Sequence, residues 1–153
     1  MLSQDVVIRN ATRQDAPELV ALLEVLFSIE DDFTADPAKQ YRGILMMLDA
    51  CGKHRCIRVA EMEGRVIGMA SVQTRISTAE GGIVGLVEDV VIQERWRGKG
   101  VGSRLLQSID VWARQHGLLR LQLLADKKNL PAIEFYRRRG WEVTELICLM
   151  KKL

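Results

Sequence analysis

Apolar side chains recur along this chain with two different periods, and the period predicts which segments are strands and which are helices. Alternating or continuous apolar runs are typical of strands, whereas apolar residues three and four apart are typical of amphipathic helices. The pattern predicts strands over residues 6–9, 55–61, 65–75, 83–93, 118–125 and 141–153, the last being one strand or two short ones. It predicts helices over residues 12–27, 37–52, 99–116 and 129–140.

The connections between these segments predict a mixed sheet. Short turns join the strands within residues 55–93, so these strands should run antiparallel. The segments 83–93, 99–116 and 118–125 form a strand–helix–strand crossover, whose two strands should run parallel. We therefore expect an α/β fold with helices on both faces of the sheet. No repeat or linker interrupts the pattern, and residues 1–153 are expected to form a single domain.

Composition narrows the class of protein. The 153 residues are 48% hydrophobic with a formal charge of +2, which describes a soluble globular protein and gives no ground for a nucleic-acid binder. No run reaches membrane-spanning length and no signal peptide is apparent. Three cysteines (Cys51, Cys56 and Cys148) suit a reducing cytoplasm. Cys51, His54 and Cys56 lack a fourth metal ligand, so we expect a cytoplasmic protein without a metal site, membrane partner or nucleic-acid partner.

The most informative segment follows the strand at 83–93. A basic turn with Arg97 and Lys99 carries glycines at alternate positions, Gly98, Gly100 and Gly102, and then enters an amphipathic helix. Glycines remove side chains where the backbone must approach a ligand, and the first amides of a helix favour anions. A ligand that carries phosphate is therefore expected at this turn.

Two known phosphate-binding loops fit this segment poorly. A Walker-type loop needs Ser or Thr after its lysine, and Lys99 is followed by Gly100. A dinucleotide fingerprint, G-x-G-x-x-G, would need a third glycine where Ser103 stands, with Asp126 as a distant candidate for the ribose. A nicotinamide-dependent oxidoreductase remains an alternative on this basis.

The segment at 97–102 matches the pattern Q/R-x-x-G-x-G/A, and the chain resembles the GNAT superfamily of acetyl-CoA-dependent N-acetyltransferases. Residues 129–141 resemble the second signature of that family, N-x-x-A-x-x-F-Y-x-x-x-G-F, with Trp141 in place of the last Phe. The order of elements agrees along essentially the whole chain. The resemblance implies a mixed, mostly antiparallel sheet with a central parallel, splayed strand pair, and helices on both faces.

The resemblance also implies where coenzyme A binds. The turn amides would hold its pyrophosphate, and a bulged strand would offer the free backbone groups of Val90, Val91 and Ile92 to the pantetheine arm. The amide of Val90 or Val91 could polarise the acetyl carbonyl. Asn129 either contacts the cofactor near its thiol or caps a helix. The turn residues implied to bind the cofactor are Arg97, Gly98, Lys99, Gly100, Val101 and Gly102.

Catalysis of acetyl transfer needs an acid for the leaving thiolate and a base for the amine. Tyr136, in the second signature, is the candidate acid, because reference pKa values of about 10 for phenol and about 8.5 for thiol allow proton sharing. Glu88 and Asp89 lie in an otherwise apolar strand, where burial would raise the pKa of a carboxyl group toward the range of a useful base. We slightly favour Glu88, acting through water, although either carboxylate could instead pair with an arginine.

The acceptor is expected to be a small cationic amine. In the family the acceptor pocket involves the first two helices and their connection, here residues 27–41, where acidic side chains gather. Candidate contacts are Phe27, Glu30 and Asp31. An exposed acidic loop is the simpler interpretation. A non-catalytic acyl-CoA sensor and a protein N-terminal or lysine acetyltransferase are the alternative functions, and a homodimer through the apolar C-terminal segment is possible.

Overall fold

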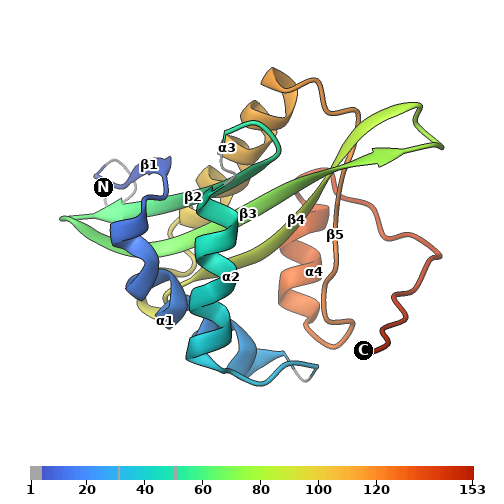
Figure 1. Ribbon diagram of the computed structural model, residues 1–153. Helices are drawn as coiled ribbons and strands as arrows, with labels where there is room; N and C mark the ends of the chain where they lie inside the picture. The colour runs from blue at the N-terminus through green and yellow to red at the C-terminus, as the bar shows by residue number, and fades with distance from the viewer. Residues whose placement is uncertain (1–4, 31, 50–51) are drawn as a thin grey trace. The chain divides into compact units, whose positions relative to one another are not determined.

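Five strands form one mixed sheet, as the hairpins and the crossover predict. The computed structural model describes residues 5–30, 32–49 and 52–153, and its strand order is β1-β2-β3-β4-β5 (Figure 1). The first four strands pair antiparallel with their neighbours. The strands are β1 (Val7–Asn10), β2 (Arg55–Met62), β3 (Arg65–Ser77), β4 (Gly82–Ile92) and β5 (Leu121–Leu123).

The chain enters β5 parallel to β4. Leu119 N donates a hydrogen bond to Ile83 O, and Gly85 N donates one to Arg120 O, each at 2.9 Å, so the residue numbers rise together on both sides. The helices are α1 (Ala16–Ile29), α2 (Pro37–Asp49), α3 (Val101–Gln115) and α4 (Leu130–Arg137), with short 3₁₀ turns η1 (Arg13–Asp15) and η2 (Glu94–Trp96). The predicted α/β class and mixed sheet are confirmed.

The chain divides into two units, one up to Gln122 and one over Leu123–Leu153. The first unit contains the sheet up to β5 and helices α1 to α3, and the second contains α4 and the C-terminal segment. The single domain expected over residues 1–153 stays a prediction. No helix in the described ranges combines the length and the apolar character needed to cross a bilayer.

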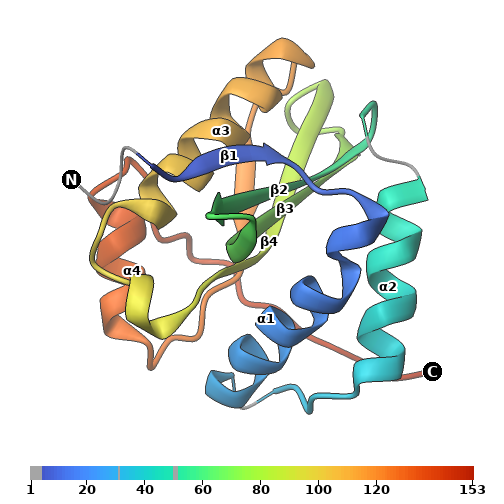
Figure 2. The same cartoon turned by 90° about the vertical axis from the view of Figure 1, so that its left-hand side faces the viewer.

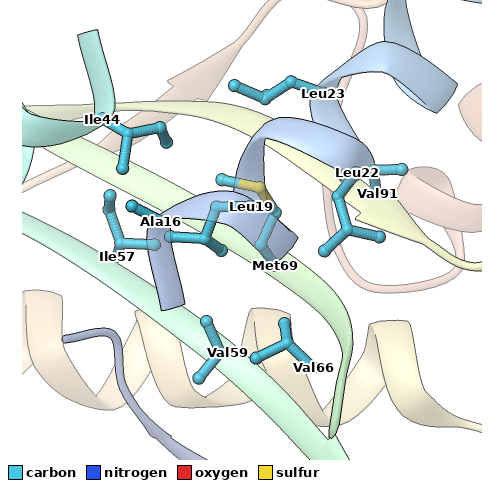
Figure 3. Close-up of a cluster of buried hydrophobic side chains, with 10 residues drawn as sticks. All are labelled: Ala16, Leu19, Leu22, Leu23, Ile44, Ile57, Val59, Val66, Met69 and Val91. Atoms are coloured by element: carbon cyan, nitrogen blue, oxygen red, sulfur yellow. The ribbon is translucent and has the colours of Figure 1, made fainter. Parts of the chain in front are cut away.

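Helices cover both faces of the sheet in the first unit, with α1 and α2 on one face and α3 on the other (Figure 2). Strand alternation explains the division, since successive residues point to opposite faces. The α1 and α2 face holds a cluster of buried apolar side chains that includes Leu19, Met69 and Val91 (Figure 3). On the other face, Gly68 leaves room for Leu105 of α3, whose methyl carbon lies 3.3 Å from where a Cβ of residue 68 would stand.

A polar cluster fixes the start of α1 against β1 and β2. The Asp15 carboxylate accepts a hydrogen bond from Thr12 N at 2.7 Å and forms a capping box with Thr12 at the start of η1. Arg9 donates to both oxygens of Asp15 and, at 2.6 Å, to Glu61. The Arg9 hydrogen bonds hold the pKa of Asp15 below its usual value despite burial. The ion pairs of Arg9 therefore hold the N-terminus of α1 against the sheet.

The C-terminal strand predicted over residues 141–153 is wrong. The described structure assigns no strand to this segment, and its apolar side chains are exposed, with Leu146 at 87% and Ile147 at 82%. A strand needs a hydrogen-bonded neighbour, and an apolar pattern alone does not supply one. β5 is also shorter than the predicted 118–125, although the residues just before it already bond to β4.

Truncating Leu19 should destabilise the first unit strongly. Leu19 is fully buried, so Leu19→Ala should lower the free energy of unfolding by about 2–5 kcal/mol through lost burial and an unfilled cavity. Met46 of α2 is 67% exposed and serves as the matched control, with an expected change within about 0.5 kcal/mol for Met46→Ala. Urea denaturation measures both. Equal midpoints for the two variants would contradict the assigned core.

Candidate active site

A bulge interrupts β4 in the middle of the sheet. Ala70 of β3 lies opposite two residues of β4, Asp89 and Val90, because the register shifts there by one residue. Asp89 has φ +54°, in the left-handed region that favours glycine and tolerates Asp better than most residues. The strand is therefore bent at the position where sequence analysis places the candidate base.

The bulge gives the two acidic residues of β4 different surroundings. Ser71 of β3 is buried, and its hydroxyl lies 3.1 Å from the carbonyl oxygen of Glu88 and 3.4 Å from a carboxylate oxygen of Asp89. Asp89 is half-buried, whereas Glu88 is exposed. The two candidate bases, of which sequence analysis slightly favours Glu88, thus have different surroundings.

The pKa of Asp89 is raised to about 6. Burial is the largest cause, the negative charges of Glu88 and Glu30 add to it, and the hydrogen bond from Ser71 opposes them. A carboxyl group with this pKa is ionised at neutral pH and accepts a proton more readily than an ordinary aspartate. The chemistry available at the bulge is therefore that of a general base.

The end of α1 contributes a second acidic group to this region. Glu30 caps α1 at its C-terminus, and its charge acts on Asp89. Beside it, the rings of Phe27 and Phe33 lie 5.4 Å apart between centroids. The structure thus brings Glu30 and Asp89 into one electrostatic neighbourhood, while the predicted contact Asp31 lies outside the described residues.

The glycine-rich turn between β4 and α3 has an open backbone. Gly98 and Gly100 have φ +71° and +82°, and a Cβ added at either would meet no protein atom within 4 Å. Backbone conformation, and not crowding by the protein, therefore favours glycine at both positions. Gly100 is the N-cap of α3, and as a glycine it has no side chain that could cap the start of this helix. The first amides of this 15-residue helix carry the positive end of its dipole, which is a suitable place for a phosphate.

Basic side chains around Trp96 add positive charge to the same turn. The guanidinium carbon of Arg95 lies 5.5 Å, and the ammonium of Lys99 4.9 Å, from the centroid of the Trp96 ring. Arg97 donates from Nε to the carbonyl oxygen of Ile92 at 3.0 Å, which holds the turn against the end of β4. Ile92 is one of the three residues whose backbone the resemblance assigns to pantetheine. The turn therefore places three basic side chains, Arg95, Arg97 and Lys99, at the N-terminus of α3.

The second unit contains the other predicted residues. The Asn129 side chain accepts a hydrogen bond from Ala132 N at 3.2 Å, so it caps α4. Tyr136 is half-buried, and its ring makes edge contacts with Phe135 at 5.3 Å and Trp141 at 5.9 Å between centroids. Aromatic packing thus orients the phenol within the second unit.

Sequence reasoning missed Ser71 and Trp96. Ser71 has a visible signal, since it is a hydroxyl within the apolar run 66–72 of a predicted strand. Trp96 is less evident, because only its position in the basic turn marks it. Within the described ranges no group of three or more His, Cys, Asp or Glu side chains could hold a metal ion, and Cys51 lies outside those ranges.

The chain is similar in sequence to known N-acetyltransferases along most of its length. The chain is 27% identical over 150 residues to an aminoglycoside N(6')-acetyltransferase type 1 of Stenotrophomonas maltophilia. This alignment covers 96% of this chain and 93% of the relative. It is 29% identical to the aminoalkylphosphonate N-acetyltransferase of Salmonella typhimurium, over 88% of this chain and 84% of that one. Another curated relative is longer, and the chain spans 62% of its length.

The fold and the family follow from two further matches. The crystal structure of a Trypanosoma brucei acetyltransferase has a TM-score of 0.74 at 24% identity, covering 97% of this chain and 100% of that one, which shows the fold alone. The model of the acetyltransferase (GNAT) family matches residues 19–141, which include the bulged strand, the glycine-rich turn and the second signature. The chain therefore belongs to the GNAT family of acetyltransferases.

Proposed function

We propose that this protein is an N-acetyltransferase that moves an acetyl group from acetyl-CoA to the primary amine of a small cationic molecule by direct attack in a ternary complex. The observation that carries the proposal is the continuity of residues 88–102. A bulged strand with a carboxyl group of raised pKa leads directly into an uncapped helix start with glycines in left-handed conformation. One short segment thus supplies a proton acceptor and a phosphate site.

The turn fits the diphosphate of coenzyme A. Two anionic phosphates need several donors and cations, and the turn offers the first amides of α3 together with Arg97 and Lys99. The space beside Gly98 and Gly100 is free of protein atoms, so the backbone is accessible. The backbone of Val90, Val91 and Ile92 would pair with the pantetheine amides. When bound, acetyl-CoA supplies the activated acetyl thioester.

Asp89 is the proposed base. An attacking amine must lose its proton, and Asp89 is ionised above about pH 6, beside a strand amide that can polarise the acetyl carbonyl. The structure supports Asp89 over Glu88, which sequence analysis slightly favours, because Glu88 is exposed to solvent. Val90 or Val91 would supply the polarising amide.

Tyr136 is the proposed acid that protonates the departing thiolate. This assignment rests on its place in the second signature and on the packing of its ring between Phe135 and Trp141. Asn129 caps α4, and we propose that it also contacts the thiol end of the cofactor.

The proposed acceptor is cationic because negative charge gathers around Asp89. Glu30 and Glu88 both act on it, and the Phe27 and Phe33 rings offer faces that attract cations. One named relative acts on aminoglycosides, which are polycations, and another on an aminoalkylphosphonate, which carries an anionic group. The acidic surroundings favour the first kind of acceptor for this chain.

The pKa of Asp89 should determine how kcat falls at acidic pH. With saturating acceptor, kcat should fall below an apparent pKa near 6, because the protonated carboxyl cannot accept the amine proton. Ser71→Ala removes the hydrogen bond that lowers the pKa of Asp89, so this fall in kcat should move to higher pH. Asp89→Asn should lower kcat by about 10²–10⁴-fold, whereas Glu88→Gln should keep the fall at acidic pH. If the fall of kcat at acidic pH disappears in Glu88→Gln and persists in Asp89→Asn, Glu88 would be the general base instead.

A stability measurement tests the same carboxyl without substrates. Because the folded pKa of Asp89 lies above its unfolded value, its contribution to stability is complete below about pH 4 and is lost as pH rises through about 6. Asp89→Asn should therefore raise the free energy of unfolding at pH 7 by about 1–3 kcal/mol and change it little at pH 4. Denaturation at the two pH values gives the comparison. An equal change at both would show that burial of the charge is not the cause.

Tyr136→Phe separates an enzyme from an acyl-CoA sensor. If the phenol donates a proton, the variant should lose most of its turnover yet bind coenzyme A as the wild type does, because only the hydroxyl is removed. Calorimetric binding and thiol release measure the two quantities. Undiminished turnover would remove Tyr136 from the mechanism, and absence of turnover in the wild type with tight coenzyme A binding would favour the sensor.

A panel of acceptors tests the charge preference. Thiol release with polyamines, aminoglycosides, neutral amino sugars, aminoalkylphosphonates and peptides should give the highest kcat/KM for acceptors with two or more positive charges. Glu30→Gln should raise KM for these acceptors by about 5–10-fold, the effect of about 1 kcal/mol of lost attraction, and should leave neutral amines unaffected. Glu24→Gln, an exposed residue of α1, is the matched control. Activity confined to neutral or anionic acceptors, or to peptides, would overturn this part of the proposal.

A further inference from the structure

A shallow cavity, open to solvent, lies on the face of the sheet that α3 covers. Its volume is about 300 Å³, and none of the glycine-turn residues 97–102 lines it. β1 and β2 supply one wall and α3 the other, beside β1 (Figure 2). The lining residues are Ile8, Arg58, Arg104, Gln107, Ser108 and Val111.

Arg58, which lines this cavity, occupies a strand position where the alternation of β2 predicts an apolar residue. Arg58 lies in β2 between Asn10 of β1 and Ala70 of β3, both in register with it. Its sequence neighbours Ile57 and Val59 are buried on the α1 and α2 face, so alternation directs Arg58 to the α3 face. A guanidinium is rarely placed in such a position unless it is paired, because removing a charge from water is costly.

Arg58 has a buried donor without a partner. Its Nε is inaccessible to solvent, and no hydrogen bond reaches it from any residue that the structure describes. No acidic side chain lines the cavity. Arg9, the arginine on the other face of the same strands, is by contrast bonded to both Asp15 and Glu61. The sheet therefore neutralises one arginine internally and leaves the other facing a cavity.

We propose that this cavity binds a small oxyanion, the phosphate or carboxylate group of a metabolite, on Arg58. Arg104 and the Gln107 amide supply further donors on the α3 wall, while the Ser108 proton is engaged with Leu105 O at 2.7 Å. Guanidinium groups match the planar or tetrahedral array of oxygen atoms in these anions. The cavity has the size of a small-molecule site. Its occupant is independent of the acetyl transfer proposed above.

Binding is tested by NMR titration of the wild-type protein with inorganic phosphate and, separately, with succinate. Saturable shifts of the Gln107 and Ser108 amides with either anion support the site, and the anion with the lower midpoint identifies the preferred group. Arg58→Met should abolish these shifts, and Arg42→Met, which removes the same charge from an exposed position on α2, should leave them unchanged. Shifts confined to residues 97–102, or equal shifts in Arg58→Met, would overturn the proposal.

Folding of the variant gives an independent readout. Because Met replaces a half-buried charge whose Nε has no partner by an apolar side chain of similar length, Arg58→Met should unfold at the same or higher urea concentration than wild type without anion. Added phosphate or succinate should raise the midpoint of the wild type more than that of the variant. Arg58→Gln, which keeps a polar side chain, replaces it if Arg58→Met does not fold. Equal stabilisation of wild type and variant by both anions would refute binding at Arg58.

Discussion

The left-handed backbone at Asp89 is the constraint on which the candidate site depends. Before the bulge, Val87 lies opposite Val72, on the α3 face of the sheet; after it, Val91 lies opposite Met69, on the α1 face. In a regular strand these two valines would point to the same face, since they are four residues apart. The bulge therefore lets β4 place apolar side chains on both faces of the sheet, Val87 against α3 and Val91 against α1. The residue that absorbs this switch is the one that presents a carboxyl group beside Ser71.

Much of the fold could be predicted because its signals are local. The hairpins and the crossover each depend on segments close in sequence, and they appear where the pattern places them. The family resemblance implies a bulge in the strand that contains residues 90–92, but the apolar pattern alone does not place it, because a bulge is a mismatch of register between β3 and β4. For the same reason the sequence could not separate Glu88 from Asp89. The strand predicted at 141–153 failed because apolar alternation does not supply a neighbouring strand.

Charge is treated differently on the two faces of the sheet. On the α1 face, Arg9 is bonded to Asp15 and Glu61. Burial and the negative charges of Glu88 and Glu30 raise the pKa of Asp89. On the α3 face, Arg58 has a buried donor and no acid among the residues that line its cavity. A charged group that is buried without a partner lowers the stability of the fold. Such groups therefore indicate where a ligand of opposite charge binds.

The empty space beside Gly100 has a consequence for how its position can vary. The fold alone asks only for a residue that tolerates φ +82°, and asparagine does so at a modest cost. If folding were the sole requirement, neutral drift would exchange glycine and asparagine there freely. Strict retention of glycine across descendants of this chain would instead record a pressure from outside the polypeptide, exerted by a molecule that rests against the bare main chain.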